Sequence, residues 1–173
     1  ESLSFRFIGT EDRKTLIPFL SSVGCEVDVT DTPVGSVTLG EAAKELNSFF
    51  ENAQEQGKAI SELTNAEKNV FVKVLGKTAD HYSKDYLSVK PESFVIMRDN
   101  YIKSVLAFSE EDEDTLSLDY AYSADPRDFA MLLKYAARRL SESYGEDVRI
   151  EMLLMNESSR EIYGRMFGEP EMK

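Results

Sequence analysis

The sequence predicts an α/β fold, in which a mixed and mainly antiparallel sheet carries helices on both faces. Three observations support this prediction. Three β-rich runs joined by turns over residues 94–123 predict an antiparallel meander. A helical pattern and another alternating run follow, and strand, helix, strand at this spacing predicts a right-handed parallel crossover. Two further helical patterns precede the meander.

The meander begins with a strand over 94–98, which ends at Asp99-Asn100, a pair that tolerates the positive φ of a tight hairpin turn. A second strand follows over 101–108. The acidic run 110–114 forms the next turn, and 115–123 then alternates strictly between apolar and polar residues. The side chains expected on one face of this third strand are Leu116, Leu118, Tyr120 and Tyr122, with Ser117, Asp119 and Ala121 on the other.

A strong helical pattern follows the meander. Asp125 is suited to cap the helix, Pro126 to its first position and Asp128 to its first turn, where negative charge is favourable. The apolar residues recur at helical spacing up to Tyr144, and Gly145 ends the pattern.

The last two elements are a strand and a helix. Residues 148–154 alternate as a strand, and Asn156 is suited to cap a helix that Gly168 closes. Upstream of the meander, Thr64 and Glu67 form a capping box before a helical pattern that continues to Tyr82. Residues 42–53 predict another amphipathic helix.

We divide the chain into residues 1–41 and a main domain over 42–173. The first segment predicts a strand over 3–8, a helix over 10–24 and an extended stretch over 27–39. This order coarsely repeats the other end of the chain, so we expect a partial repeat or the tail of a preceding, similar domain. The amino end has neither an initiator Met nor a leader pattern, which suggests a piece of a longer protein.

Composition and charge exclude several classes of protein. At 42% hydrophobic residues the chain can form a core, and its net charge of −12 disfavours nucleic acid and anionic membranes as partners. The single cysteine, Cys25, excludes an internal disulfide. Cys25 and the single histidine, His81, cannot supply the four ligands of a Cys/His zinc site. We therefore expect no bound metal and a cytoplasmic location. The acidic run lacks the spacing and the glycine of a calcium loop.

The last helix carries the motif Asn156-Glu-Ser-Ser159-Arg-Glu-Ile-Tyr163-Gly-Arg-Met-Phe167-Gly168. With the order of elements before it, this motif resembles the GCN5-related N-acetyltransferase superfamily over roughly residues 42–170, although the closing Phe-Gly pair is inverted. The resemblance implies transfer of an acetyl group from acetyl-coenzyme A to a primary amine of a small molecule or peptide. It also implies that Tyr163 is the general acid that protonates the departing thiolate; the alternative is an aromatic residue packed on the core.

The resemblance further implies a cofactor site at the start of the crossover helix, where helix N–H groups bind the pyrophosphate. The residues placed there are Arg127, Asp128, Phe129 and Ala130, with Asn156 beside the cofactor arm or acting only as a cap. However, the stretch 123–130 lacks the family's glycines. Pro126 removes a donor, and two carboxylates oppose the phosphate. We therefore expect weak binding of acetyl-coenzyme A, on the order of 10⁻⁴ M or poorer.

Two hypotheses follow for the function. The first is an N-acetyltransferase, in which Tyr163 is the acid and Asp119, in the middle of a strand, is a candidate general base. Asp119 and Glu151 are also typical of carboxylates that simply face solvent. The second is a catalytically inactive module that keeps the fold for binding or regulation after losing the pyrophosphate loop.

Overall fold

The structure is a computed structural model that describes residues 13–24, 33–75, 93–154 and 157–172. The helices are α1 (Arg13–Ser22), α2 (Leu39–Phe49), the 3₁₀ turn η1 (Ile60–Glu62), α3 (Asn65–Leu75), α5 (Pro126–Tyr144) and α6 (Glu157–Phe167). The strands are β1 (Pro33–Thr38), β2 (Lys58–Ala59), β3 (Phe94–Arg98), β4 (Tyr101–Asp112), β5 (Thr115–Ser123), β6 (Arg149–Leu153) and β7 (Glu171–Met172).

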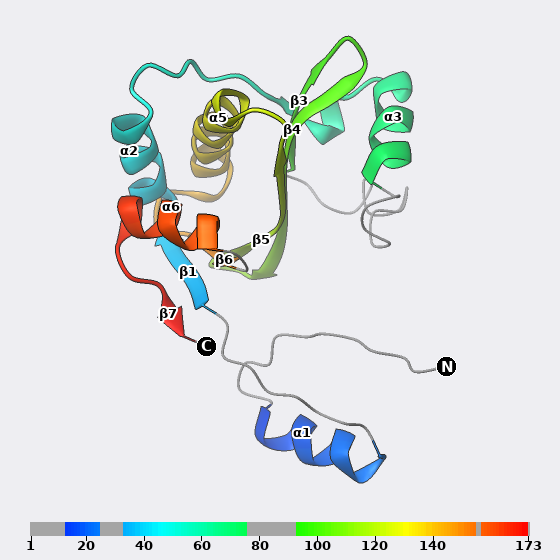
Figure 1. Cartoon of the computed structure of the whole chain (residues 1–173), viewed down its shortest axis with the longest axis vertical. Helices are drawn as coiled ribbons and strands as arrows, with labels where there is room; N and C mark the ends of the chain where they lie inside the picture. The colour runs from blue at the N-terminus through cyan, green and yellow to red at the C-terminus, as the bar shows by residue number, and fades with distance from the viewer. Residues whose placement is uncertain (1–12, 25–32, 76–92, 155–156, 173) are drawn as a thin grey trace.

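The strands form one sheet in the order β2-β3-β4-β5-β6-β1-β7 (Figure 1). The pair β5 and β6 is parallel and joined by α5, as the crossover prediction requires. The other neighbouring pairs are antiparallel. Asp99 and Asn100 have φ values of 53° and 62°, so they form the expected turn between β3 and β4. The predicted mixed, mainly antiparallel sheet is confirmed.

Helices cover both faces of this sheet, also as predicted. In Figure 1, α2, α5 and α6 lie on one side of the strands and α3 lies on the other. Fully buried side chains of the core between α5 and the sheet are Leu39, Phe94, Leu106, Leu132 and Leu140. Buried side chains of the core on the α3 side are Ile60, Phe71, Val95, Val105 and Ala107.

The predicted alternation along β5 is wrong after Leu118. Leu118 pairs with Phe108, but Ala107 pairs with Tyr120, so Asp119 is an extra residue in β5. This β-bulge reverses the faces, because two residues of one strand then oppose one residue of the other. As a result Leu118 packs on the α5 side, whereas Tyr120 packs with Ala107 on the α3 side.

The strand β1 lies inside the sheet, between β6 and β7. It leads directly into α2, whose first turn is closed by a capping box between Thr38 and Glu41. A division after residue 41 would therefore cut α2 and separate β1 from its sheet. The origin of the first segment in a preceding domain stays a prediction. The expected strand over 3–8, Cys25, His81 and Asn156 lie outside the described residues.

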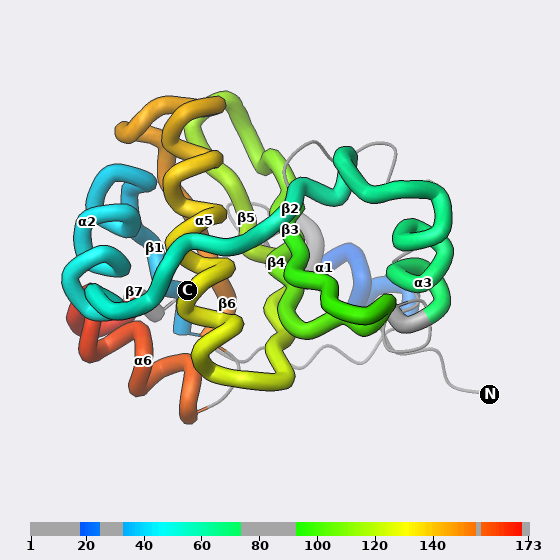
Figure 2. Tube along the Cα trace, turned by 90° about the horizontal axis from the view of Figure 1, so that it is seen from above, coloured from blue at the N-terminus to red at the C-terminus, as the bar shows by residue number. Residues whose placement is uncertain are grey.

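A strap, residues 51–57, joins α2 to β2 and crosses over α5 (Figure 2). Lys134 of α5 donates to the carbonyl oxygens of Phe50 and Ala53 at 3.2 and 2.8 Å. At the far end of the strap, a Cβ on Gly57 would lie 2.5 Å from the ring of Tyr135. The strap thus passes so close to α5 that only a glycine fits there.

Candidate functional site

The amino end of α5 lies where the resemblance places the pyrophosphate. Asp125 is the cap, as predicted, and its Oδ1 accepts from the Arg127 N–H at 2.7 Å. The Asp125 N–H in turn donates to the Ser123 hydroxyl oxygen at 3.3 Å. The chain therefore supplies an anion of its own to a position that would otherwise attract a phosphate.

The donors expected at this end are mostly in use. The Phe129 N–H donates to the Asp125 carbonyl oxygen at 3.1 Å, so it belongs to the helix ladder. Ala130 lies one residue further into the helix and is buried. The N–H groups of Arg127 and Phe129 are therefore already hydrogen-bonded within the chain, and a role of Arg127, Phe129 and Ala130 in cofactor binding stays a prediction. The side chain of Arg127 is exposed and remains available as a cation.

Asp128 is the other acidic residue in this turn, and its carboxylate is engaged in an ion pair. It accepts two hydrogen bonds from the Arg98 guanidinium, at 2.7 and 2.9 Å, and the residue is 6% exposed. Arg98 also donates to the side-chain oxygen of Gln56 at 3.1 Å. This bidentate pair joins the first turn of α5 to the end of β3. The sequence alone does not single out Arg98, because its partner depends on how α5 packs across the sheet.

The parallel pairing of β5 with β6 stops before β5 ends, and we call this point the splay. The pairing runs from Thr115 with Arg149 to Leu118 with Met152; β6 ends at Leu153, whereas β5 continues to Ser123. The bulge at Asp119 coincides with the end of this ladder. Bulges commonly re-aim side chains beside active sites, so this splayed region is a candidate binding site.

Asp119, the candidate base, is exposed at this splay. Its Oδ1 accepts from the Ser109 hydroxyl at 2.9 Å. Ser109 is two residues from Ala107 along β4, which places it on the α3 side of the sheet. The carboxylate of Asp119 is thus directed toward that face.

Tyr163, the candidate acid, is 6% exposed and lies on the opposite face. Its hydroxyl donates to the Ser36 carbonyl oxygen at 2.9 Å and accepts from the Ser36 N–H at 3.0 Å. Its ring lies against Gly35, where a Cβ would be 2.5 Å from the ring. The hydrogen bonds of the Tyr163 hydroxyl are therefore with β1, which β6 separates from β5. The structure does not bring Tyr163 and Asp119 together.

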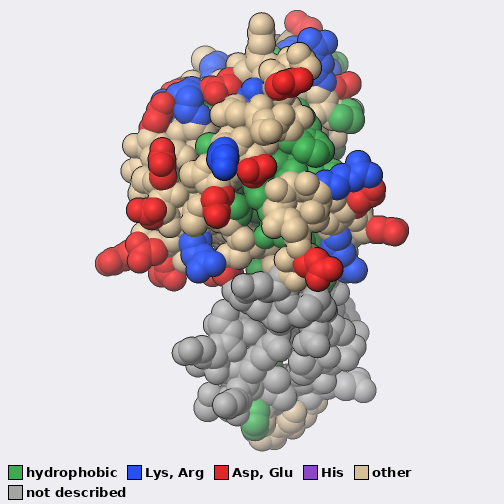
Figure 3. Space-filling view, turned by 90° about the vertical axis from the view of Figure 1, so that its left-hand side faces the viewer, with side chains coloured by type: hydrophobic (Ala, Val, Ile, Leu, Met, Phe, Trp, Pro, Cys, Tyr) green, Lys and Arg blue, Asp and Glu red, His purple; other side chains and the backbone are tan. Residues whose placement is uncertain are grey.

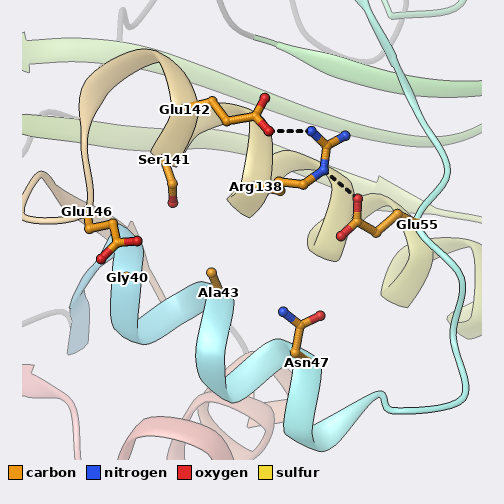
Figure 4. Close-up of a pocket in the computed structure, with 8 residues that line it drawn as sticks. All are labelled: Gly40, Ala43, Asn47, Glu55, Arg138, Ser141, Glu142 and Glu146. Atoms are coloured by element: carbon orange, nitrogen blue, oxygen red, sulfur yellow. Dashed lines mark hydrogen bonds and ion pairs between the residues drawn. The ribbon is translucent and has the colours of Figure 1, made fainter.

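A groove of about 300 Å³ lies between α2 and the carboxyl-terminal half of α5 (Figure 4). Arg138 crosses it and pairs with Glu55 at 2.6 Å and with Glu142 at 2.7 Å. These carboxylates, Glu55 first, raise the pKa of the Arg138 guanidinium. Arg138 is twelve residues from Pro126, about 18 Å along the helix, so the groove is separate from the amino end of α5.

Metal-ligand clusters and membrane-spanning helices are both absent from the described ranges. There, no group of three or more His, Cys, Asp or Glu side chains is placed to hold a metal ion. No helix in that part of the chain is long and apolar enough to cross a bilayer. Figure 3 shows acidic and basic side chains interspersed around an apolar area on the face it presents.

Comparison with known proteins supports the fold. Neither a family model nor a curated protein matches the chain. A functionally unknown conserved protein from Staphylococcus epidermidis matches 92% of the chain with a TM-score of 0.56 at 10% identity. A GCN5-related N-acetyltransferase from Kribbella flavida matches 91% of it with a TM-score of 0.53 at 13% identity. The chain spans 64% and 61% of these two structures. At such identities the comparison shows a shared fold, similar to that of a GCN5-related N-acetyltransferase.

Proposed function

We propose that this chain is an acetyltransferase-fold module that does not itself transfer acetyl groups and that serves in binding or regulation. The observation that carries the proposal is the closed amino end of α5. The Asp125 carboxylate occupies the Arg127 N–H at 2.7 Å, and Pro126 has no N–H to offer. A pyrophosphate there would have to displace a carboxylate that is covalently part of the site.

The position of Tyr163 supports the same proposal. A general acid must reach the atom that it protonates, within about 3.2 Å or through one water. The Tyr163 hydroxyl is instead bonded to the backbone of Ser36 on β1, on the side of β6 away from the splay. Transfer by this residue would require those bonds to break.

The second candidate is an N-acetyltransferase that moves acetyl from acetyl-coenzyme A to a primary amine of a small molecule or peptide. The splay of β5 and β6 with its bulge at Asp119 favours this candidate, because bulges commonly re-aim side chains beside active sites. The Kribbella flavida neighbour is a GCN5-related N-acetyltransferase, which also favours it. Under either proposal we place the chain in the cytoplasm, in keeping with a single cysteine.

An acetyl-transfer assay separates the two candidates. The protein is incubated with acetyl-coenzyme A and a panel of primary amines and peptides, and release of the coenzyme A thiol is recorded. The module proposal predicts no release above the rate without protein. Amine-dependent release that Tyr163→Phe lowers by about 10²- to 10⁴-fold would establish the transferase instead.

A further inference from the structure

The outer edge of β1 is protected along its length by three different partners. In the antiparallel ladder with β6, the Leu154 N–H donates to the Pro33 carbonyl oxygen and the Leu39 N–H to that of Val148. Hydrogen-bonded positions alternate along such a ladder, so Val34, Ser36 and Thr38 direct their N–H and C=O groups away from β6. These are the groups that an edge strand exposes to further pairing.

Each position on this edge is satisfied differently. Val34 pairs with Glu171 of β7. At Thr38 the N–H donates to the Glu41 carboxylate at 3.3 Å, within the capping box of α2. Between them, both backbone groups of Ser36 bond to the Tyr163 hydroxyl, at 3.0 and 2.9 Å.

We infer that Tyr163 is an edge seal, a side chain that replaces a strand residue at Ser36 and thereby fixes where β7 ends. The register Val34 with Glu171 would place Glu169 opposite Ser36 if β7 extended toward its amino end. The Tyr163 hydroxyl offers one donor and one acceptor, the same pair that the Glu169 backbone would bring. Because that hydroxyl already occupies Ser36, neither Glu169 nor a strand from a second copy can pair there.

Gly35 makes the seal possible. A Cβ at this position would lie 2.5 Å from Cε2 and 2.7 Å from Cδ2 of Tyr163, so the ring rests directly on the strand backbone. The ring contacts Phe167 as well, with centroids 5.2 Å apart, which holds it from the α6 side. The inference concerns the edge of the sheet and holds whether or not the chain transfers acetyl groups.

Amide hydrogen exchange of the whole chain tests this inference. In Tyr163→Phe the ring and its packing remain, but the N–H and the C=O of Ser36 both lose their hydrogen bond to the Tyr163 hydroxyl. We expect the Ser36 amide to exchange roughly fivefold faster, the factor that corresponds to one ordinary hydrogen bond. If β7 lengthens instead, Ser36 stays protected and the Glu169 amide gains protection. If a second copy pairs, the protection of Ser36 rises with protein concentration.

Tyr135→Phe is the matched control. Its ring also lies against a glycine, 2.5 Å from a Cβ on Gly57, but its hydroxyl makes no hydrogen bond among the described residues. This variant should leave the Ser36 amide unchanged. Tyr163→Phe with the Ser36 and Glu169 amides both unchanged, at every concentration, would overturn the inference.

Discussion

Asp128→Ala should destabilise the protein by about 2 kcal/mol. The side chain of Asp128 is 9% exposed and that of Arg98 is 40% exposed. Removing one partner of a fully buried pair costs about 3–5 kcal/mol, whereas an exposed pair contributes at most about 1 kcal/mol. Water reaches the Arg98 guanidinium, so the cost falls between these limits. A loss of about 2 kcal/mol lowers the melting temperature of a domain of this size by roughly 4–8 °C.

Urea unfolding followed by circular dichroism measures this loss as a shift in midpoint at constant slope. Glu142→Ala is the control, because it removes a carboxylate from the same helix whose side chain is 55% exposed. We expect it to cost no more than about 0.5 kcal/mol. In the Asp128→Ala background, Arg98→Ala should add little. Equal midpoints for Asp128→Ala and Glu142→Ala would refute the view that the Arg98 pair anchors the start of α5.

Two further predictions concern local packing and pH. Gly35→Ala should cost about 1–3 kcal/mol in urea unfolding, because its Cβ overlaps the Tyr163 ring, whereas Gly164→Ala, with nothing within 4 Å, should not destabilise. The backbone N–H of Thr64, then Lys58, lowers the pKa of Glu67 from 4.5 to about 2. A lowered pKa stabilises the fold above the unfolded value and loses that contribution as pH falls through the folded one. The free energy of unfolding of the wild type should therefore exceed that of Glu67→Gln above pH 4.5, and the difference should vanish toward pH 2. A difference independent of pH between these limits would contradict this role for Glu67.

The sequence predicts elements well where local rules agree. The cap, proline and closing glycine of α5 and the Asp99-Asn100 turn were identified from residue types alone. Each depends on backbone conformations that a few neighbouring residues determine.

The features that were missed depend on contacts between distant segments. Ser36 and Tyr163 are 127 residues apart, and nothing in either neighbourhood indicates their bonds. The bulge at Asp119 reverses a face without changing the residue pattern that predicts a strand. Asp128 is a further example. From the sequence it is a carboxylate in the first turn of a helix, and only the packing of α5 beside β3 shows its ion pair with Arg98. For the same reason, the sequence indicates Tyr163 by a motif and Asp119 by its strand position, but it does not show that the two side chains lie on opposite faces of the sheet.

Calorimetric titration of the wild-type chain with acetyl-coenzyme A tests the central claim most directly. The claim is that the amino end of α5 is closed to pyrophosphate by the Asp125 cap at the Arg127 N–H. We predict a Kd on the order of 10⁻⁴ M or poorer, which corresponds to a binding free energy of about −5.5 kcal/mol or weaker. Micromolar binding that Arg127→Ala weakens would contradict the claim, because it would show that this helix end accepts the cofactor despite its own carboxylate.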